Sequence, residues 1–223
     1  MIKVVLFDLD DTLYNERDFV YSGFMAVAKY ISEKHGLCIE EVYEKILDIF
    51  YKKGRGRIFN ILCEMYSIEE DIHTLVGIYR ETKPSIELYE DARYILDKLK
   101  GDYQLGIITD GKNTVQWSKI KALGIERYMD KIIVTDDHGR DYWKPSEKPY
   151  QAMLEYFGGD PKEFVYIGDN PHKDFISCKK LGMHTVRVIR ELGDHMQVCL
   201  GDQYEADYNV NTLYELESIF NLL

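Results

Sequence analysis

Five short apolar runs interrupt a chain that is otherwise rich in charged side chains. They lie at Lys3–Asp8, Gln104–Thr109, Lys131–Thr135, Glu163–Gly168 and His184–Val188. Nearly continuous apolar runs of this length are typical of strands that are buried on both faces. We therefore predict that the five runs are the strands of one parallel sheet.

Segments with helical periodicity separate the later strands. Apolar side chains recur at helical spacing between Leu88 and Leu99 and form one face. Two further segments, Lys121–Gly124 and Lys179–Gly182, place lysine in a last turn and glycine after it. These residue types complement the helix dipole and the left-handed cap position. The alternation predicts an α/β core, with helices on both faces of the parallel sheet.

Residues 15–83 break this alternation, because they contain several helical patterns with no strand between them. Phe24, Val27 and Ile31 share one face of the first pattern. The simplest interpretation is a small all-helical domain, residues 15–83, inserted after the first strand. The core would then comprise residues 1–14 and 84–223, with Pro84 in the turn that leaves the insertion.

Composition narrows the class of protein further. The 223 residues are 45% apolar and carry a formal net charge of −11, which argues against a nucleic-acid partner. No segment approaches the roughly 18 apolar residues of a membrane helix, so no membrane partner is expected. The four cysteines are widely spaced, which favours free thiols in a reducing compartment. Asp8 interrupts the apolar run at the N-terminus, so this run does not resemble a signal peptide, and we expect a cytoplasmic protein. The sequence leaves open whether the protein is a monomer or a homodimer.

Polar residues follow four of the five predicted strands. Because the carboxyl ends of parallel strands meet at one edge of a sheet, these residues should lie close together. They are Asp8, Asp10, Asp11 and Thr12; Thr109, Asp110 and Gly111; Lys144; and Asp169 and Asp174. A single aspartate after a strand is a common helix cap, but four such loops at one edge favour a binding site.

The three aspartates in "DLDD", Asp8, Asp10 and Asp11, raise an electrostatic question. Like charges repel, and a carboxylate beside a buried core is costly unless a partner compensates it. Either a cation binds at this position, or one carboxyl group keeps its proton, or both.

These motifs resemble those of the haloacid dehalogenase (HAD) superfamily, in particular its phosphatases with an aspartate nucleophile. The D-x-D-x-T motif of the family matches Asp8, Asp10 and Thr12, and its Thr motif matches Thr109. The Lys motif with its aromatic residue matches Lys144, Pro145 and Tyr150. The G-D-x-x-x-x-D motif matches Gly168, Asp169 and Asp174. One departure is Glu147, where the family often has a second proline. Lys148 is a rival to Lys144, although the spacing to the aromatic residue favours Lys144.

The resemblance implies a Rossmann-like core, a helical cap and an Mg²⁺-dependent phosphatase acting on a small phosphorylated molecule. Asp8 would attack phosphorus and form an aspartyl-phosphate. Asp10 would act as general acid and base, which requires a raised pKa. Asp8, the backbone carbonyl of Asp10, and Asp169 would bind Mg²⁺. Asp174 would either support this metal site or pair with Lys144.

The resemblance also assigns the residues that hold phosphate. Thr109 and the backbone N–H groups around Asp110 and Gly111 would bind phosphate oxygens. Lys144 would neutralise the charge of the transition state and orient Asp8.

Three other functions remain possible. A haloacid dehalogenase attacks carbon without a metal, and the carboxylate at Asp10 argues against it. A phospho-receiver domain would carry its phosphorylated aspartate after the third strand and would lack a helical insertion. A catalytically inactive scaffold would be expected to lack some of the motif residues, which are all present.

The predicted helical insertion contains one basic cluster. "YKKGRGR" at Tyr51–Arg57 places Lys52, Lys53, Arg55 and Arg57 around two glycines. The cluster is either a solvated corner between two helices or a set of substrate-specificity residues. Arginine suits the second role because it binds carboxylate or phosphate through two hydrogen bonds.

Overall fold

The computed structural model describes all of residues 1–223. The chain forms two compact units. The first comprises Met1–Glu16 and Ile86–Leu223, and the second comprises Arg17–Ser85. The boundaries of these units lie two residues beyond the predicted boundaries at residues 14 and 83.

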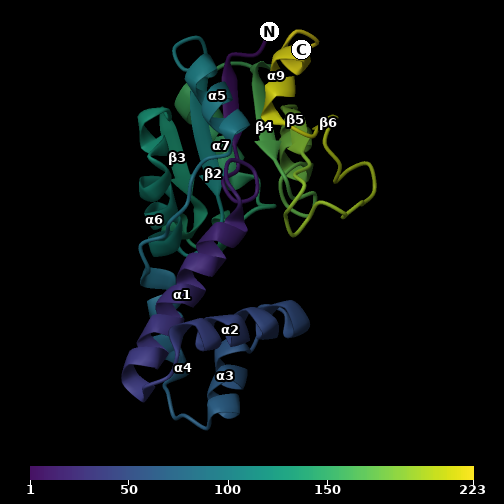
Figure 1. The fold of residues 1–223 in the computed structure, drawn as a ribbon. Helices are drawn as coiled ribbons and strands as arrows, with labels where there is room; N and C mark the ends of the chain where they lie inside the picture. Colours follow the sequence, from purple (N-terminus) through teal and green to yellow (C-terminus); the bar gives the residue numbers. More distant parts are fainter. The chain divides into compact units, whose positions relative to one another are not determined.

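The first unit is built on a six-stranded parallel sheet with the order β3-β2-β1-β4-β5-β6 (Figure 1). The strands are β1 Val4–Phe7, β2 Gln104–Thr109, β3 Lys131–Val134, β4 Phe164–Gly168, β5 His184–Val188 and β6 Tyr208–Val210. β1 lies between β2 and β4, in parallel register with both, and is buried along its whole length. The predicted parallel sheet is therefore confirmed.

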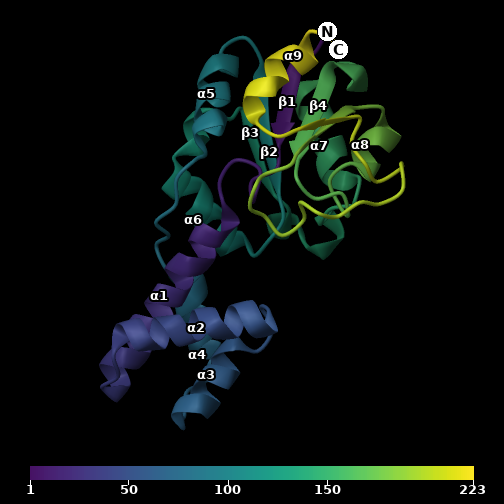
Figure 2. The same ribbon diagram turned by 45° about the vertical axis from the view of Figure 1, so that its right-hand side comes forward.

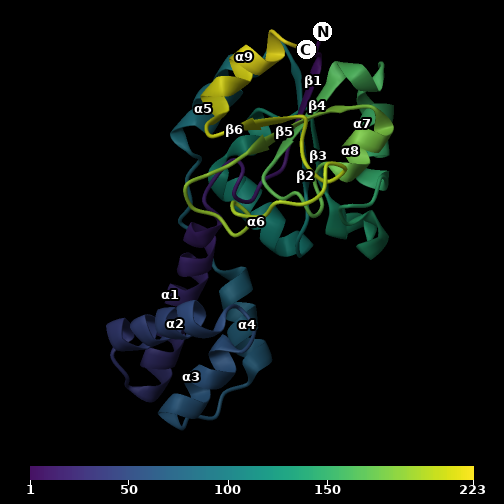
Figure 3. The same ribbon diagram turned by 90° about the vertical axis from the view of Figure 1, so that its right-hand side faces the viewer.

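Helices cover both faces of this sheet, as predicted. They are α5 Glu90–Leu99, α6 Asn113–Leu123, α7 Lys148–Phe157, α8 Ile176–Leu181 and α9 Leu216–Phe220. α7 and α8 lie on one face, and α5 and α9 lie on the other (Figure 3). Tyr150 and Met153 of α7 pack with Leu6 of β1 in one buried apolar cluster. The α/β, Rossmann-like fold is thus confirmed for this unit.

The sequence pattern missed β6, which adds a sixth strand at the edge of the sheet. β6 has three residues, and only Val210 among them is buried. A pattern with a period of two residues cannot be recognised over so short a length. At the C-terminus, a 3₁₀ turn at Leu213–Glu215 precedes the short helix α9.

The second unit is entirely helical. Its helices are α1 Glu16–His35, α2 Ile39–Lys53, α3 Ile58–Tyr66 and α4 Ile72–Glu81. α2 crosses α1 in two views (Figure 2), and apolar side chains of all four helices form one core that includes Phe24, Ile46, Leu62 and Leu75. None of the helices in the chain combines the length and apolar character that crossing a membrane would require.

Candidate active site

Asp8 and Lys144 form a buried ion pair at the carboxyl end of the sheet. Asp8 follows β1 directly, and its backbone N–H donates to the carbonyl of Ile167 at 2.8 Å. The Lys144 ammonium donates to Asp8 Oδ1 at 2.6 Å and to Asp174 Oδ1 at 2.8 Å. The Lys144 side chain is 0% exposed. The chain therefore brings together an aspartate from the first motif, the lysine from the third and an aspartate from the fourth.

The three charges shift one another's pKa. Burial, together with repulsion by Asp174, raises the pKa of Asp8 to about 6, even though Lys144 acts in the opposite direction. Burial alone would raise the pKa of Asp174 and lower that of Lys144. Their mutual attraction is stronger, so the pKa of Asp174 is lowered and that of Lys144 is raised well above its ordinary value. Lys144 and Asp174 are thus both held in their charged forms.

Two residues of β4, Tyr166 and Gly168, shape this cluster. Tyr166 accepts a hydrogen bond from the Lys144 ammonium at 2.9 Å and donates to the carbonyl of Ile108 at 3.3 Å. A Cβ atom at Gly168 would lie 2.5 Å from Asp174 Oδ2, so only glycine allows the carboxylate to approach the end of β4. This contact explains in steric terms why glycine stands at the first position of the G-D-x-x-x-x-D motif.

The acidic residues at this edge fit a hard metal ion. Carboxylate oxygens of Asp8, Asp169 and Asp174, all buried, lie within 4.8 Å of one another. Asp169 Oδ2 is buried and has no hydrogen-bond partner. Burial, followed by the charges of Asp174 and Asp8, raises the pKa of Asp169 well above its ordinary value. An oxygen-only set of this kind, with an unsatisfied carboxylate oxygen, suits Mg²⁺.

Asp10 occupies a different environment from Asp8. The phenol of Tyr14 donates to Asp10 Oδ1 at 2.5 Å, and the Lys119 ammonium donates to the same oxygen at 2.7 Å. Burial alone would raise the pKa of Asp10, but Lys119 and the hydrogen bonds from Tyr14 and Gln116 lower it overall. The expectation of a raised pKa at Asp10 was therefore wrong for this state. The expectation rested on repulsion by nearby carboxylates and did not include Lys119, which the fold brings in from α6.

Thr109 ends β2 and is completely buried. The Gln116 amide donates to Thr109 Oγ1 at 2.6 Å, which leaves the hydroxyl proton for another acceptor. Gly111 follows in a left-handed conformation with φ of 136°, and a Cβ there would lie 2.9 Å from the Gln116 amide oxygen. Glycine at this position therefore leaves room for the side chain that reaches Thr109.

The Asp110 side chain is engaged by neighbouring protein groups. Its Oδ1 accepts from the Thr135 hydroxyl at 2.7 Å and from the backbone N–H of Lys144 at 3.2 Å. The Lys173 ammonium lies 3.6 Å from Oδ2. The carboxylate thus ties the loop after β2 to the loop that carries Lys144, and only the backbone of Asp110 remains for phosphate.

Comparisons with known proteins agree with this geometry. The model of the haloacid dehalogenase-like hydrolase family matches residues 5–188. The chain belongs to this family. It is 34% identical, over 98% of its own length and 97% of the relative's, to a glyceraldehyde 3-phosphate phosphatase from Methanocaldococcus jannaschii. The predicted resemblance to HAD phosphatases is therefore confirmed.

Two solved structures carry the same fold. A HAD phosphatase from Thermococcus onnurineus is 28% identical with a TM-score of 0.63, and the match covers 98% of each chain. The HAD hydrolase YfnB from Bacillus subtilis, solved with magnesium bound, has a TM-score of 0.70 at 20% identity over 99% of each chain. The second likeness concerns the fold alone.

The other basic residues singled out from the sequence of this HAD hydrolase are Lys148 and the basic cluster of the helical unit. Lys148 is exposed and pairs with Asp141. The residues of the basic cluster, Lys52, Lys53, Arg55 and Arg57, are all exposed on the helical unit. Within that unit Lys52 pairs with Asp48 at 2.7 Å, and Arg57 pairs with Glu64 at 3.2 Å. These acidic partners already neutralise part of the cluster.

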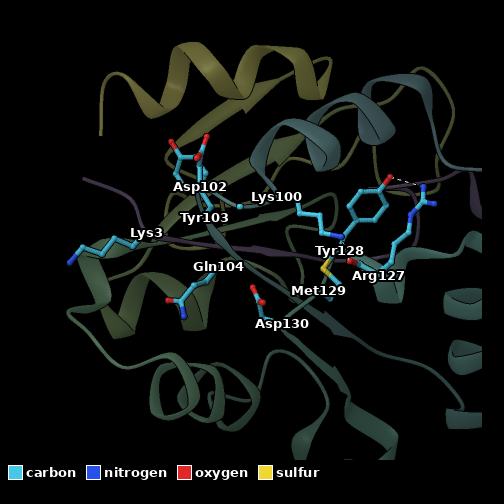
Figure 4. A pocket seen from close by; sticks show the side chains of 10 residues that line it. Lys3, Lys100, Asp102, Tyr103, Gln104, Arg127, Tyr128, Met129 and Asp130 are labelled. Atoms are coloured by element: carbon cyan, nitrogen blue, oxygen red, sulfur yellow. Dashed lines mark hydrogen bonds between the residues drawn. The ribbon is translucent and has the colours of Figure 1, made fainter.

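The opposite edge of the sheet carries a hollow of about 580 Å³ (Figure 4). Its charged side chains are exposed, and several bind one another or backbone groups. Lys3 pairs with Glu163 at 2.5 Å, and the Lys100 ammonium donates to the carbonyl of Arg127 at 2.6 Å. The Arg127 guanidinium donates to the phenol of Tyr128 at 2.8 Å. We do not place the active site in this hollow, because these side chains do not converge on a shared point.

Sequence reasoning missed the polar neighbours of the motif residues. These are Tyr14 and Lys119 at Asp10, Gln116 at Thr109, Tyr166 at Lys144, and Lys173 at Asp110. A signal did exist for two of them. Gln116 and Lys119 are three residues apart on α6 and share a face with the apolar residues Val115 and Ile120. Polar side chains on the apolar face of a helix indicate buried partners.

Proposed function

We propose that the chain is an Mg²⁺-dependent phosphatase that hydrolyses a small phosphomonoester through an aspartyl-phosphate on Asp8. One observation supports this most strongly. The Asp8 carboxylate is paired with a fully buried lysine and lies within 4.8 Å of a carboxylate oxygen of Asp169, a residue whose Oδ2 has no hydrogen-bond partner. A nucleophile, a cation for phosphate charge and a metal-binding oxygen thus converge at the carboxyl end of β1.

Asp8, Asp169 and the backbone carbonyl of Asp10 would hold the metal ion. Asp174 would hold Lys144 in place rather than bind the metal directly, because its two oxygens already accept hydrogen bonds from Lys144 and from the backbone N–H of Asn170. A bound Mg²⁺ would neutralise phosphate charge and align the phosphoryl group.

The protein's own groups would carry out the two half-reactions. An Asp8 carboxylate oxygen attacks phosphorus, and the bond to the leaving oxygen breaks as Asp10 protonates that oxygen. Water then attacks the aspartyl-phosphate while Asp10 accepts its proton, which regenerates Asp8 and releases phosphate. The Thr109 hydroxyl and the backbone N–H groups of Asp110 and Gly111 would bind phosphate oxygens, and Lys144 would offset the charge of the transition state.

Glyceraldehyde 3-phosphate is the first substrate to test, because the relative from Methanocaldococcus jannaschii is named for it and matches nearly the whole chain. We further propose that the helical unit is a cap that selects the substrate. Arg55 and Arg57, with Lys52, are its candidate specificity residues. Arg57 would have to exchange Glu64 for the substrate anion.

The test is phosphate release from glyceraldehyde 3-phosphate and from p-nitrophenyl phosphate, with Mg²⁺ and after EDTA treatment. We expect both substrates to be hydrolysed with Mg²⁺, both activities to disappear with EDTA, and added Mg²⁺ to restore them. Full activity in EDTA would contradict the proposal. Halide release from 2-chloropropionate without phosphate release would instead favour a dehalogenase.

A further inference from the structure

Asp10 is held by three donors from two different parts of the chain. Tyr14, four residues further along, and Lys119 both donate to Oδ1, at 2.5 and 2.7 Å. The Gln116 amide donates to Oδ2 at 2.9 Å. A carboxylate with both oxygens engaged in this way cannot rotate freely about its terminal bond, so its orientation is fixed.

The two donors from α6 are unusual residues to bury. Gln116 is 1% exposed and Lys119 is 2% exposed. Burying a lysine is costly unless it is paired, and burying an amide without partners is also costly. Lys119 offsets this cost through its ion pair with Asp10, and the Glu16 carboxylate lies 3.7 Å from its ammonium group. A purely structural position on this helix face would be filled more cheaply by an apolar residue.

Gln116 also connects two functional residues. The same amide nitrogen that donates to Asp10 also donates to Thr109 Oγ1, at 2.6 Å. The side chain passes over Gly111, where a Cβ would approach the amide to 2.9 Å. The distance between the Asp10 carboxylate and the Thr109 hydroxyl is therefore set by a third side chain that bonds both.

We propose that Gln116 and Lys119 are positioning residues that orient the Asp10 carboxylate for proton transfer to the leaving group. This inference rests on the proposed phosphatase function, since it concerns how Asp10 performs its role. Neither residue needs to touch the phosphoryl group. Both act through Asp10, and Gln116 also acts through Thr109.

The contacts indicate which oxygen of Asp10 would exchange a proton with the reacting groups. Oδ1 accepts two hydrogen bonds, whereas Oδ2 accepts one. Oδ2 therefore keeps a lone pair for a proton. In the first half-reaction a proton that Oδ2 has taken up from solvent moves to the leaving oxygen as the phosphorus–oxygen bond breaks. In the second, Oδ2 takes a proton from the attacking water. No other co-reactant is required.

The test compares two leaving groups in the same variant. p-Nitrophenolate is a good leaving group that departs without a proton, whereas the alkoxide of an alkyl phosphate such as glycerol 3-phosphate needs one. kcat/KM is the appropriate quantity, because it reports the steps up to formation of the aspartyl-phosphate. The variants are Lys119→Met and Gln116→Met. The control is Lys121→Met, which makes the same change at an exposed position of α6.

We expect Lys119→Met and Gln116→Met to lower kcat/KM for glycerol 3-phosphate by about 100-fold, the lower end of the range for general acid catalysis. The loss for p-nitrophenyl phosphate should be at least about tenfold smaller. Lys121→Met should match the wild type on both substrates. Lys119→Arg, which keeps the charge and the donors, should recover most of the activity towards glycerol 3-phosphate.

Equal losses on both substrates would overturn the inference, because a misfolded or generally distorted site does not distinguish leaving groups. Unchanged kcat/KM on both substrates would overturn it as well. Failure of the phosphatase proposal itself is separate, since it would appear as wild-type protein that hydrolyses neither substrate with Mg²⁺. If Lys119→Met does not fold, Gln116→Met carries the same comparison without removing a charge.

Discussion

The charged residues at the two ends of the strands, here called the carboxyl edge and the amino edge of the sheet, differ in their exposure to water. At the carboxyl edge, the Lys144 side chain is 0% exposed and lies between Asp8 and Asp174. At the amino edge, the Lys3 side chain is 64% exposed and pairs with Glu163. Both are lysine–carboxylate pairs beside β1, and both join it to a residue at or near β4. They differ in how far the surrounding chain excludes water.

This difference decides what each pair contributes. An exposed pair is screened by water and is worth little, whereas a buried pair loses its hydration and depends on its partners. Such an arrangement costs stability unless all charges remain, and it holds reactive groups in fixed positions. The polar hollow at the amino edge is a well-formed depression, but its exposed charged pairs neither depend on their partners for stability nor hold reactive groups in fixed positions (Figure 4).

The largest contrast between the edges should appear in turnover. Asp8→Asn retains the shape of the side chain but removes the nucleophile, so we expect the rate of phosphate release to fall on the order of 10⁴-fold or more. Asp102→Asn makes the same change in the hollow at the amino edge and should leave turnover near the wild-type value. Comparable losses in both variants would show that the chemistry does not belong to the carboxyl edge.

The next contrast concerns stability without metal. Lys144→Met leaves Asp8 and Asp174 buried with no cation between them, and we expect the free energy of unfolding to fall by about 3–5 kcal/mol. Lys3→Met at the amino edge should lower it by no more than about 1 kcal/mol. Urea unfolding of both variants in EDTA provides the measurement. A small effect of Lys144→Met would mean that water reaches the Asp8 cluster.

The smallest contrast is the response of stability to pH. The folded pKa of Asp8, about 6, lies above its ordinary value of 3.8, so the folded state holds this proton more tightly. As pH rises through this window, the metal-free wild type should lose stability relative to Asp8→Asn. At the amino edge, the Lys3 hydrogen bond lowers the pKa of Glu163. The stability that this pair contributes should disappear as pH falls below the ordinary value of 4.5.

Urea unfolding between about pH 3 and 7 in EDTA, with Glu163→Gln as the second reference variant, measures both slopes. The wild-type advantage over Glu163→Gln should grow with rising pH, whereas the advantage over Asp8→Asn should shrink. Slopes of the same sign would contradict the assigned environments of the two carboxyl groups.

The sequence predicted the elements that short patterns can specify. Continuous apolar runs identified five strands, and the motif order indicated which loops would meet at the carboxyl edge. β6 escaped detection because three residues with one buried side chain carry no period. The residues around Asp10 escaped for another reason. Lys119 is 109 positions away along the chain, and only the folded sheet brings the two together.

Asp10 shows what such a long-range contact changes. Local sequence suggested repulsion among carboxylates and a raised pKa. Burial does act to raise the pKa of Asp10, but the charge of Lys119 and the hydrogen bonds from Lys119, Tyr14 and Gln116 together lower it. The basic cluster raises a similar point, since Arg57 and Lys52 have acidic partners within the helical unit. The formal charge of a segment therefore did not indicate how much of that charge remained available.

The most direct test of the central claim is a crystal structure with Mg²⁺ and beryllium trifluoride, which mimics a phosphoryl group bound to a carboxylate. The account predicts beryllium bonded to a carboxylate oxygen of Asp8, with Mg²⁺ coordinated by Asp8 and Asp169 and with Lys144 in contact with the fluoride. Beryllium on another residue, or a metal-free complex, would contradict the claim that Asp8 forms an aspartyl-phosphate beside a magnesium ion.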